Sequence, residues 1–181
     1  WKWLQDYVSL KMPHDELVER LSMAGLNHEK SKTVGDDLQI DLEVTSNRPD
    51  CLGQIGVARE ISVLWQTGLA VPPPRPAAGG PPVTELTKVG IECPRLCFRY
   101  TARVLQGVRV GPSPQWMVDR LATIGIPAIN NVVDVTNYVM MECGQPLHAF
   151  DFAKLAGPAI VVRVSEPGEL FEAINHKSYP L

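Results

Sequence analysis

The run INNVVDVTNY at residues 129–138, resumed by GQPLHAFD at residues 144–151, decides how this chain is interpreted. It places asparagine, aspartate, threonine, glutamine and histidine side chains in an otherwise apolar segment. Burying such groups costs roughly 1 to 3 kcal/mol each unless they are hydrogen-bonded. A chain that places so many of them within a few turns therefore needs them for a polar network or for a ligand.

The first run predicts a helix that begins near Asn131 and ends at Gly144. Asn131, with Asp134 three residues later, resembles a capping arrangement at a helix start. Glycine can adopt the left-handed conformation that ends a helix, and Pro146 prevents the helix from resuming. The valines between these positions favour a strand instead, since they are better strand formers.

The residues around this helix predict a mixed α/β region. Ser113 followed by Pro114 is typical of a helix cap and first turn, and the apolar stripe behind them ends at Gly125. Short apolar runs predict strands in the same region. The strands are expected at residues 89–92, 97–105 and 160–164, with a turn at residues 165–168.

A stretch rich in proline and glycine precedes this region. Residues 70–82 contain PPP and GGPP, which remove backbone donors or add backbone freedom and so exclude regular structure. A semi-rigid linker is predicted, and a proline-rich ligand for another domain is the alternative. The predicted domains are therefore residues 1–69 and 87–181, with residues 70–86 as the linker.

The N-terminal part predicts helices and one strand. Residues 1–8 are expected to form a short helix, and residues 14–25 an amphipathic one with acids in its first turn and glycine at its end. Residues 38–44 alternate apolar and polar side chains, which is the pattern of a half-buried strand. Asp50 is placed to cap a further helix that runs to about Gln66.

Composition and charge narrow the class of protein. The 181 residues, 45% hydrophobic and 20% charged, suit one medium or two small domains. The apolar runs are far shorter than the roughly 18 residues of a membrane span and no signal-peptide pattern is present, so a cytoplasmic protein without membrane contact is expected. A net charge of −3 lacks the basic excess of non-specific nucleic-acid binders, and Lys30 with Lys32 is predicted to be solvated surface.

Neither a metal site nor a disulfide is predicted. Of the four cysteines, only Cys93 and Cys97 lie close in sequence, and no second Cys or His pair completes a zinc site. Reduced thiols are expected, because a reducing cytoplasm disfavours disulfides.

Three blocks of the sequence resemble the beta subunit of bacterial phenylalanyl-tRNA synthetase, in the order found in that family. Residues 129–151 resemble the signature of its B3 region. DLEVTSNRPDCLGQIGVAREI at residues 41–61 is similar to the end of its B1 domain, and residues 3–26 are similar to the helical opening of that domain. The resemblance implies an α+β chain, in which a small helical, winged-helix-like B1-type domain precedes a mixed α/β B3-type domain that is incomplete at its C-terminus.

The resemblance also implies a function. Family members belong to phenylalanine-tRNA ligase, which charges tRNA in translation, and hydrolyse tyrosine wrongly attached to phenylalanine tRNA. A hydrophobic pocket rejects an isostere with one added hydroxyl by only about a hundredfold, so a second, hydrolytic site can supply the rest. Matched position by position, Thr136 and Asn137 are implied to bind substrate in this editing pocket, and His148 to be the catalytic residue that positions water or the terminal ribose.

Cofactors and partners follow from the same resemblance. ATP, magnesium and phenylalanine bind the alpha subunit in this family, so the chain itself is expected to hold no cofactor and no metal. The implied partners are the alpha subunit, in a heterotetramer of two alpha and two beta subunits, and phenylalanine tRNA.

The chain departs from the family pattern in two ways. Residues 27–37 stand where typical beta subunits insert the B2 domain, an oligonucleotide-binding fold. The chain also begins with Trp1, inside a reading frame, and stops early in the B3/B4 unit. We therefore expect an N-terminal fragment that does not edit efficiently alone.

The residues by themselves leave other interpretations open. His148 can be a structural histidine, Thr136 and Asn137 can bind backbone or solvent, and Arg48 can contact a partner. A thiol hydrolase built on Cys143 and His148 lacks an orienting acid. For the whole chain, the alternative is a non-catalytic module for assembly or nucleic-acid contact.

Overall fold

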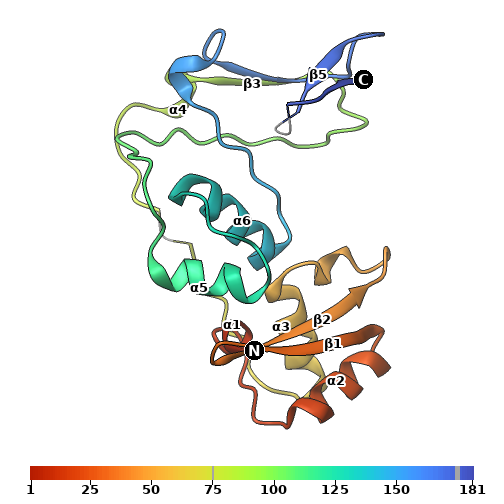
Figure 1. Ribbon diagram of the computed structural model, residues 1–181. Helices are drawn as coiled ribbons and strands as arrows, with labels where there is room; N and C mark the ends of the chain where they lie inside the picture. Colours follow the sequence, from red (N-terminus) through yellow and green to blue (C-terminus); the bar gives the residue numbers. More distant parts are fainter. Residues whose placement is uncertain (75, 174–175) are drawn as a thin grey trace. The chain divides into compact units, whose positions relative to one another are not determined.

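The computed structural model describes residues 1–74, 76–173 and 176–181 (Figure 1). Its fold is α+β, as predicted, with two-stranded sheets among the described residues. Two compact units are present: the first comprises Trp1–Arg75 and Arg109–Ala149, and the second Pro76–Val108 and Phe150–Leu181. This division differs from the predicted domains because residues 109–149 group with the N-terminal part; the family-domain boundaries stay predictions.

The first unit consists mainly of helices and carries one hairpin. Its elements are α1 (Lys2–Gln5), α2 (His14–Met23), β1 (Leu26–Val34), β2 (Asp37–Val44), the 3-10 turn η1 (Pro49–Cys51), α3 (Gln54–Leu64), α5 (Gln115–Thr123) and α6 (Asn131–Cys143). The predicted helices and the strand at residues 38–44 are confirmed, and Gly25 and Gly125 have the left-handed φ values, 93° and 82°, expected after α2 and α5. No helix among the described residues is long and apolar enough to cross a bilayer.

The strand β1 was missed by the sequence analysis. It pairs antiparallel with β2, and Val34 lies opposite Asp37. Gly35 between them has φ +59°, which suits the first central position of a two-residue hairpin turn. The dipeptide Gly-Asp at residues 35–36 is itself a hairpin signal, so this strand was accessible from the sequence.

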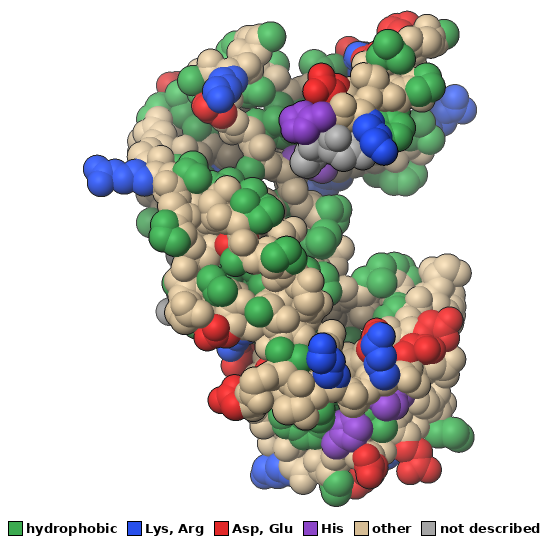
Figure 2. Space-filling model, viewed as in Figure 1, with side chains coloured by type: hydrophobic (Ala, Val, Ile, Leu, Met, Phe, Trp, Pro, Cys, Tyr) green, Lys and Arg blue, Asp and Glu red, His purple; other side chains and the backbone are tan. Residues whose placement is uncertain are grey.

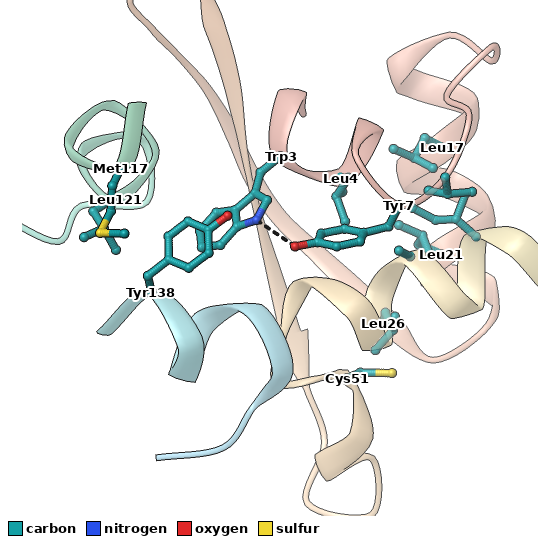
Figure 3. Close-up of a cluster of buried hydrophobic side chains, with 13 residues drawn as sticks. Trp3, Leu4, Tyr7, Leu17, Leu21, Leu26, Cys51, Met117, Leu121 and Tyr138 are labelled. Atoms are coloured by element: carbon teal, nitrogen blue, oxygen red, sulfur yellow. Dashed lines mark hydrogen bonds between the residues drawn. The ribbon is translucent and has the colours of Figure 1, made fainter. Parts of the chain in front are cut away.

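The core lies in the first unit, between α1, α2, α3, α5 and α6 (Figure 3). The buried hydrophobic side chains among the described residues belong to it, with the exception of Val18. The core side chains are Trp3, Leu4, Tyr7, Val8, Leu17, Leu21, Leu26, Cys51, Ala58, Ile61, Met117, Leu121 and Tyr138. Residues of α5 and α6 thus share one core with the N-terminal helices, although about 50 residues of chain lie between α3 and α5.

The second unit has little regular structure. Its elements are α4 (Val83–Leu86), β3 (Lys88–Ile91), the 3-10 turn η2 (Phe152–Lys154), β4 (Ala159–Val162), β5 (Leu170–Glu172) and β6 (Ser178–Pro180). The strand β3 pairs parallel with β4, and β5 pairs antiparallel with β6. The strands predicted near residues 89–92 and 160–164 are confirmed.

The strand predicted at residues 97–105 is wrong. These residues form no strand, and Phe98 and Leu105 are 88% and 73% exposed. A strand needs a neighbour for its backbone N–H and C=O groups, and among the described residues no strand pairs with this segment.

Candidate functional site

Two adjacent asparagines hold the start of α6 in different ways. Asn130, not Asn131, is the N-cap: its side-chain oxygen accepts from the N–H groups of Val132 and Val133, at 3.1 and 3.0 Å. Asn131 instead binds the backbone before α5 with both ends of its amide. Its Oδ1 accepts from the Gly111 N–H over 3.2 Å, and its Nδ2 donates to the Arg109 carbonyl oxygen over 2.9 Å. The predicted capping position was therefore one residue too late. Either asparagine could cap the helix, but the side chain of Asn131 is hydrogen-bonded to the backbone before α5.

Asp134 is the buried polar centre of this region. Its carboxylate is fully buried and accepts from the Ser113 hydroxyl and, over 2.8 Å, from the N–H of Ile129. Ser113 was predicted to cap α5, but its hydroxyl donates to Asp134 and the N-cap position belongs to Pro114. Part of the polar run at residues 129–138 therefore forms a structural network.

Thr136 and Asn137 lie on another face of α6. With Val133 and Met140 they follow the spacing i, i+3, i+4, i+7 of one helical face, and all four side chains are half-buried or exposed. The Thr136 hydroxyl donates to the Val133 carbonyl oxygen over 2.7 Å. Within the part of the chain that the structure describes, the Asn137 amide makes no side-chain hydrogen bond.

His148 follows the end of α6. Gly144 ends this helix, as predicted, with φ 76° and an N–H donated to the Met140 carbonyl oxygen over 2.8 Å. Residues 145–151 form no helix or strand, and His148 is exposed. The helix itself thus brings Thr136 and Asn137 together, whereas His148 lies on a separate segment, and its catalytic role stays a prediction.

Two shallow hollows are present on the first unit. One, of about 350 Å³, is lined by residues 5–10, 68 and 70, and the other, of about 490 Å³, by residues 1, 2, 5, 14, 33 and 36–38. Neither is lined by Thr136, Asn137 or His148. Neither hollow can therefore be the predicted editing pocket.

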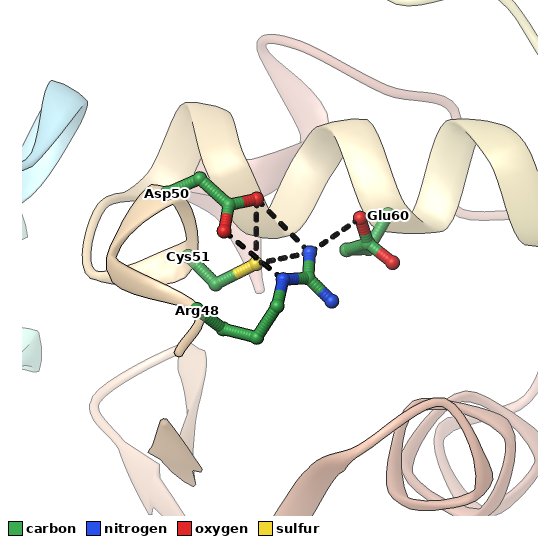
Figure 4. A network of polar contacts seen from close by, with 4 residues as sticks. All are labelled: Arg48, Asp50, Cys51 and Glu60. Atoms are coloured by element: carbon green, nitrogen blue, oxygen red, sulfur yellow. Dashed lines mark hydrogen bonds and ion pairs between the residues drawn. The ribbon is translucent and has the colours of Figure 1, made fainter. Parts of the chain in front are cut away.

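The turn before α3 holds a compact polar cluster (Figure 4). Arg48 donates to Asp50 through Nε and Nη2 at 3.0 and 2.9 Å, to Glu60 at 2.6 Å and to the Cys51 Sγ at 3.0 Å. The predicted cap by Asp50 is therefore wrong: its carboxylate binds Arg48, and Gly53 is the N-cap residue of α3.

The same cluster is the one place among the described residues where metal-ligand atoms gather. Those of Asp50, Cys51 and Glu60 lie within 4.8 Å of one another. The Arg48 guanidinium already supplies positive charge there, and its hydrogen bonds hold the pKa of Asp50 at about 2. Burial raises the pKa of the Cys51 thiol to about 11, so this sulfur is not a ready thiolate ligand. These residues do not fit a resident cation.

Arg48→Met is expected to make stability less sensitive to acid. A carboxyl group with a depressed pKa in the folded state contributes stability above its ordinary pKa and loses it as pH falls through the folded-state value. For Asp50 this window runs from 3.8 down to about 2. Urea unfolding midpoints across this window should fall more steeply for the wild type than for Arg48→Met. Lys154→Met, which removes a 3.9 Å exposed pair with Asp151, should keep the wild-type slope; equal slopes for Arg48→Met and the wild type would contradict the prediction.

The two signature stretches meet at two glycines. A Cβ atom at Gly53 would lie 2.6 Å from the Gly144 backbone nitrogen and 2.9 Å from the Glu142 carbonyl oxygen. The backbone of the turn before α3 thus lies so close to the end of α6 that no side chain fits at position 53. Gly53 therefore has a packing reason that is independent of a ligand, and Gly144 has a conformational one, its φ of +76°.

Comparison with known proteins identifies the family of the chain. Residues 96–181 match the model of the B3/4 domain. The chain is 57% identical, over its whole length of 181 residues, to the phenylalanine–tRNA ligase beta subunit of Rhodopirellula baltica. The chain belongs to the family of phenylalanine–tRNA ligase beta subunits. Family members from Anaeromyxobacter dehalogenans and Moorella thermoacetica are 47% and 50% identical over 81% and 77% of it.

The chain spans about a quarter of the length of a beta subunit or less. It covers 27% of the Rhodopirellula protein, 18% of the Anaeromyxobacter protein and 17% of the Moorella protein.

Sequence reasoning missed two groups of residues in this family member. Asp50 and Glu60, both acids within twelve positions of Arg48, were a signal that this arginine is paired within the chain. The contacts of Tyr138 with Trp3, 135 residues away, leave no local pattern, so no sequence signal could have found them.

Proposed function

We propose that this chain is part of a phenylalanine–tRNA ligase, the aminoacyl-tRNA synthetase that charges tRNA with phenylalanine for protein synthesis. The observation that carries the proposal is the 57% identity to a beta subunit over the whole chain. Because the chain corresponds to 27% of that protein, the isolated chain is proposed to be inactive.

We further propose that α6 contributes to hydrolytic editing of tyrosyl-tRNA(Phe). Val133 and Met140 offer apolar surface to an aromatic ring, and Asn137 has amide donors and an acceptor to offer to the phenol. The face itself carries no charged side chain at its four positions, Val133, Thr136, Asn137 and Met140, and Figure 2 shows few charged side chains on the side of α5 and α6 that it displays. Phenylalanine lacks the phenol hydroxyl and would leave such polar partners unpaired, which is the selectivity that an editing site needs.

His148 is proposed to position the attacking water or the tRNA's terminal ribose, and Thr136 to orient the ester end by accepting a hydrogen bond from the α-ammonium group beside it. The Thr136 hydroxyl proton is already donated to the Val133 carbonyl, so its oxygen acts here as an acceptor. This assigns substrate binding to Thr136 and Asn137 and the catalytic step to His148.

The wider assembly belongs to the same proposal. Residues 1–69 are proposed as a winged-helix-like B1-type domain, in which the β1–β2 hairpin takes the place of a wing, and residues 87–181 as the first part of the B3/B4 domain. The partners are the alpha subunit, in an assembly of two alpha and two beta chains, and phenylalanine tRNA in the cytoplasm. ATP and Mg²⁺ are assigned to the alpha subunit, as the family resemblance implies.

A non-catalytic module for nucleic-acid contact has less support. Such a module needs a basic face, but Arg20, Arg48 and Arg120 of the first unit are each paired with an acid. Arg48 binds Glu60 at 2.6 Å and Arg120 binds Asp6 at 2.6 Å.

The proposal predicts that His148→Ala and Asn137→Ala slow editing by about 10- to 100-fold, in the range that a positioned acid–base group or polar contact contributes. The assay is hydrolysis of tyrosyl-tRNA(Phe) by the full-length beta subunit assembled with its alpha partner. Val135→Ala is the matched control, because Val135 is 43% exposed on α6 but lies outside the face of Thr136 and Asn137. Aminoacylation with phenylalanine should be unchanged in all three variants.

Two results would decide against parts of this proposal. Absence of hydrolysis by the wild type would leave this region as scaffold or assembly module. Hydrolysis that is independent of pH through the range where histidines titrate would exclude His148 as a general base and leave it a positioning role.

A further inference from the structure

The middle of α6 is held by an aromatic cluster that the proposed chemistry does not use. The ring of Tyr138 is 8% exposed and stacks on Trp3, with centroids 4.4 Å apart and 25° between the planes (Figure 3). Trp116 of α5 meets the same ring edge-on at 5.4 Å. Arg120 donates to the Tyr138 hydroxyl oxygen over 2.7 Å and pairs with Asp6 over 2.6 Å. Groups from α1, from the residue after it and from α5 therefore fix this side chain.

Glu142 provides another anchor one turn later. Its carboxylate accepts from the Tyr7 hydroxyl, and the Tyr7 oxygen accepts from the Trp3 Nε1 over 3.2 Å. Burial, and then the bond to Glu142, raise the pKa of the Tyr7 hydroxyl, which keeps it a donor. Asp134 is anchored one turn before Tyr138. Anchors at every fourth residue lie along one face of a helix.

The anchored residues Asp134, Tyr138 and Glu142 determine the direction in which the other face of α6 points. Thr136 lies about 200° around the helix from Tyr138, and Asn137 about 100°, at 100° per residue. A helix with side chains has a radius of about 5 to 6 Å, so a rotation of about 10° moves an outer atom by about 1 Å. A misplacement of about 1 Å can cost about a hundredfold in rate. A rotation of α6 by about 10° is therefore enough to change the reaction rate at a site on its outer face by about a hundredfold.

We infer that Trp3 and Tyr138 are positioning residues for Thr136 and Asn137, because they fix the rotation of α6 about its axis. The N-terminal segment, more than 100 residues away in sequence, thus sets the direction of the substrate-binding face. This inference rests on the proposed editing function. Trp3 and Tyr138 lie in the core and act through the helix, without contact with the substrate.

Trp3→Leu tests the inference most directly, because it removes the stacking partner and leaves α6 unchanged. In the full-length beta subunit assembled with its alpha partner, we expect the kcat for tyrosyl-tRNA(Phe) hydrolysis to fall at least about tenfold, with KM changed less than about threefold. Aminoacylation should keep its wild-type rate. Trp3→Phe retains a stacking ring and should restore hydrolysis to within about threefold of the wild type.

Two further variants separate positioning from loss of stability. Leu17→Ala removes a fully buried side chain of α2 and should destabilise at least as much as Trp3→Leu, yet keep wild-type hydrolysis well below its unfolding temperature. Tyr138→Phe keeps the ring and loses only the bond from Arg120, so it should fold and lower kcat by about three- to tenfold. If Trp3→Leu does not fold, the kcat of Tyr138→Phe is the measurement that tests the inference.

The possible outcomes are distinct. Wild-type hydrolysis that is lost in His148→Ala but unaffected in Trp3→Leu and Tyr138→Phe would overturn the inference and leave the proposed function standing. An equal loss in Leu17→Ala and Trp3→Leu would also overturn it, since general destabilisation would then explain both. A wild type without hydrolysis would remove the proposed function and the inference together.

Discussion

Gly56→Ala is expected to destabilise the chain by at least about 3 kcal/mol, although alanine is the better helix former by about 1 kcal/mol. Gly56 lies in the first turn of α3. A Cβ atom there would lie 1.7 Å from the Asp50 carbonyl oxygen and 2.9 Å from the Cys51 Cα. Both neighbours are backbone atoms, so no side chain can swing away and the turn itself must open. That turn carries the Arg48 cluster, so the loss extends beyond one contact.

The measurement is the urea-induced unfolding of the 181-residue chain, followed by tryptophan fluorescence. Gly68→Ala is the matched control, since Gly68 has an ordinary φ and a Cβ atom there would meet nothing within 4 Å. It should change the free energy of unfolding by less than about 0.5 kcal/mol. A stabilised Gly56→Ala variant would mean that helix propensity decides at this position and that the close approach is relieved without cost.

Local signals predicted the helices well because their causes are local. The helix α2 begins after Pro13 and ends at a left-handed Gly25, α5 ends at Gly125 and α6 at Gly144. Apolar spacing and a terminal glycine lie within one short stretch of sequence in each case.

Strands were predicted less well because a strand depends on a partner elsewhere in the chain. The polar β1 is a strand because β2 pairs with it. Residues 97–105 contain more apolar side chains, but they are not a strand in the absence of a partner among the described residues. Hydrophobic alternation alone cannot distinguish these cases.

The polar run in α6 shows what the sequence predicts of the candidate site and what it does not. The run was expected to serve a network or a ligand, and Asn130 and Asp134 do form a network in the structure. Which polar side chains are left over for a ligand depends on the rotation of the helix. That rotation is set by Trp3, which lies 135 positions before Tyr138, and no local pattern encodes it.

Asp134→Ala is the second substitution expected to have a large effect, a loss of roughly 2 to 5 kcal/mol in the free energy of unfolding. The carboxylate is fully buried and accepts from the Ser113 hydroxyl and the Ile129 N–H. Without it, both donors lose the acceptor that the buried carboxylate provides. Each such orphaned donor costs about 1 to 3 kcal/mol, which is more than the bond contributes when it is formed.

A series of variants can separate the two donors. Asp134→Asn keeps the shape and one acceptor but turns its NH₂ group toward the other donor, so about half of the loss is expected. Ser113→Ala should cost only about 1 kcal/mol, because the carboxylate keeps the bond from Ile129. The double variant Ser113→Ala/Asp134→Ala leaves only the Ile129 N–H orphaned, and should therefore be more stable than the sum of the single losses by about 1 kcal/mol. Strict additivity would show that Ser113 and Asp134 act independently, and the polar run of α6 would then not be the connected network that holds the helix start.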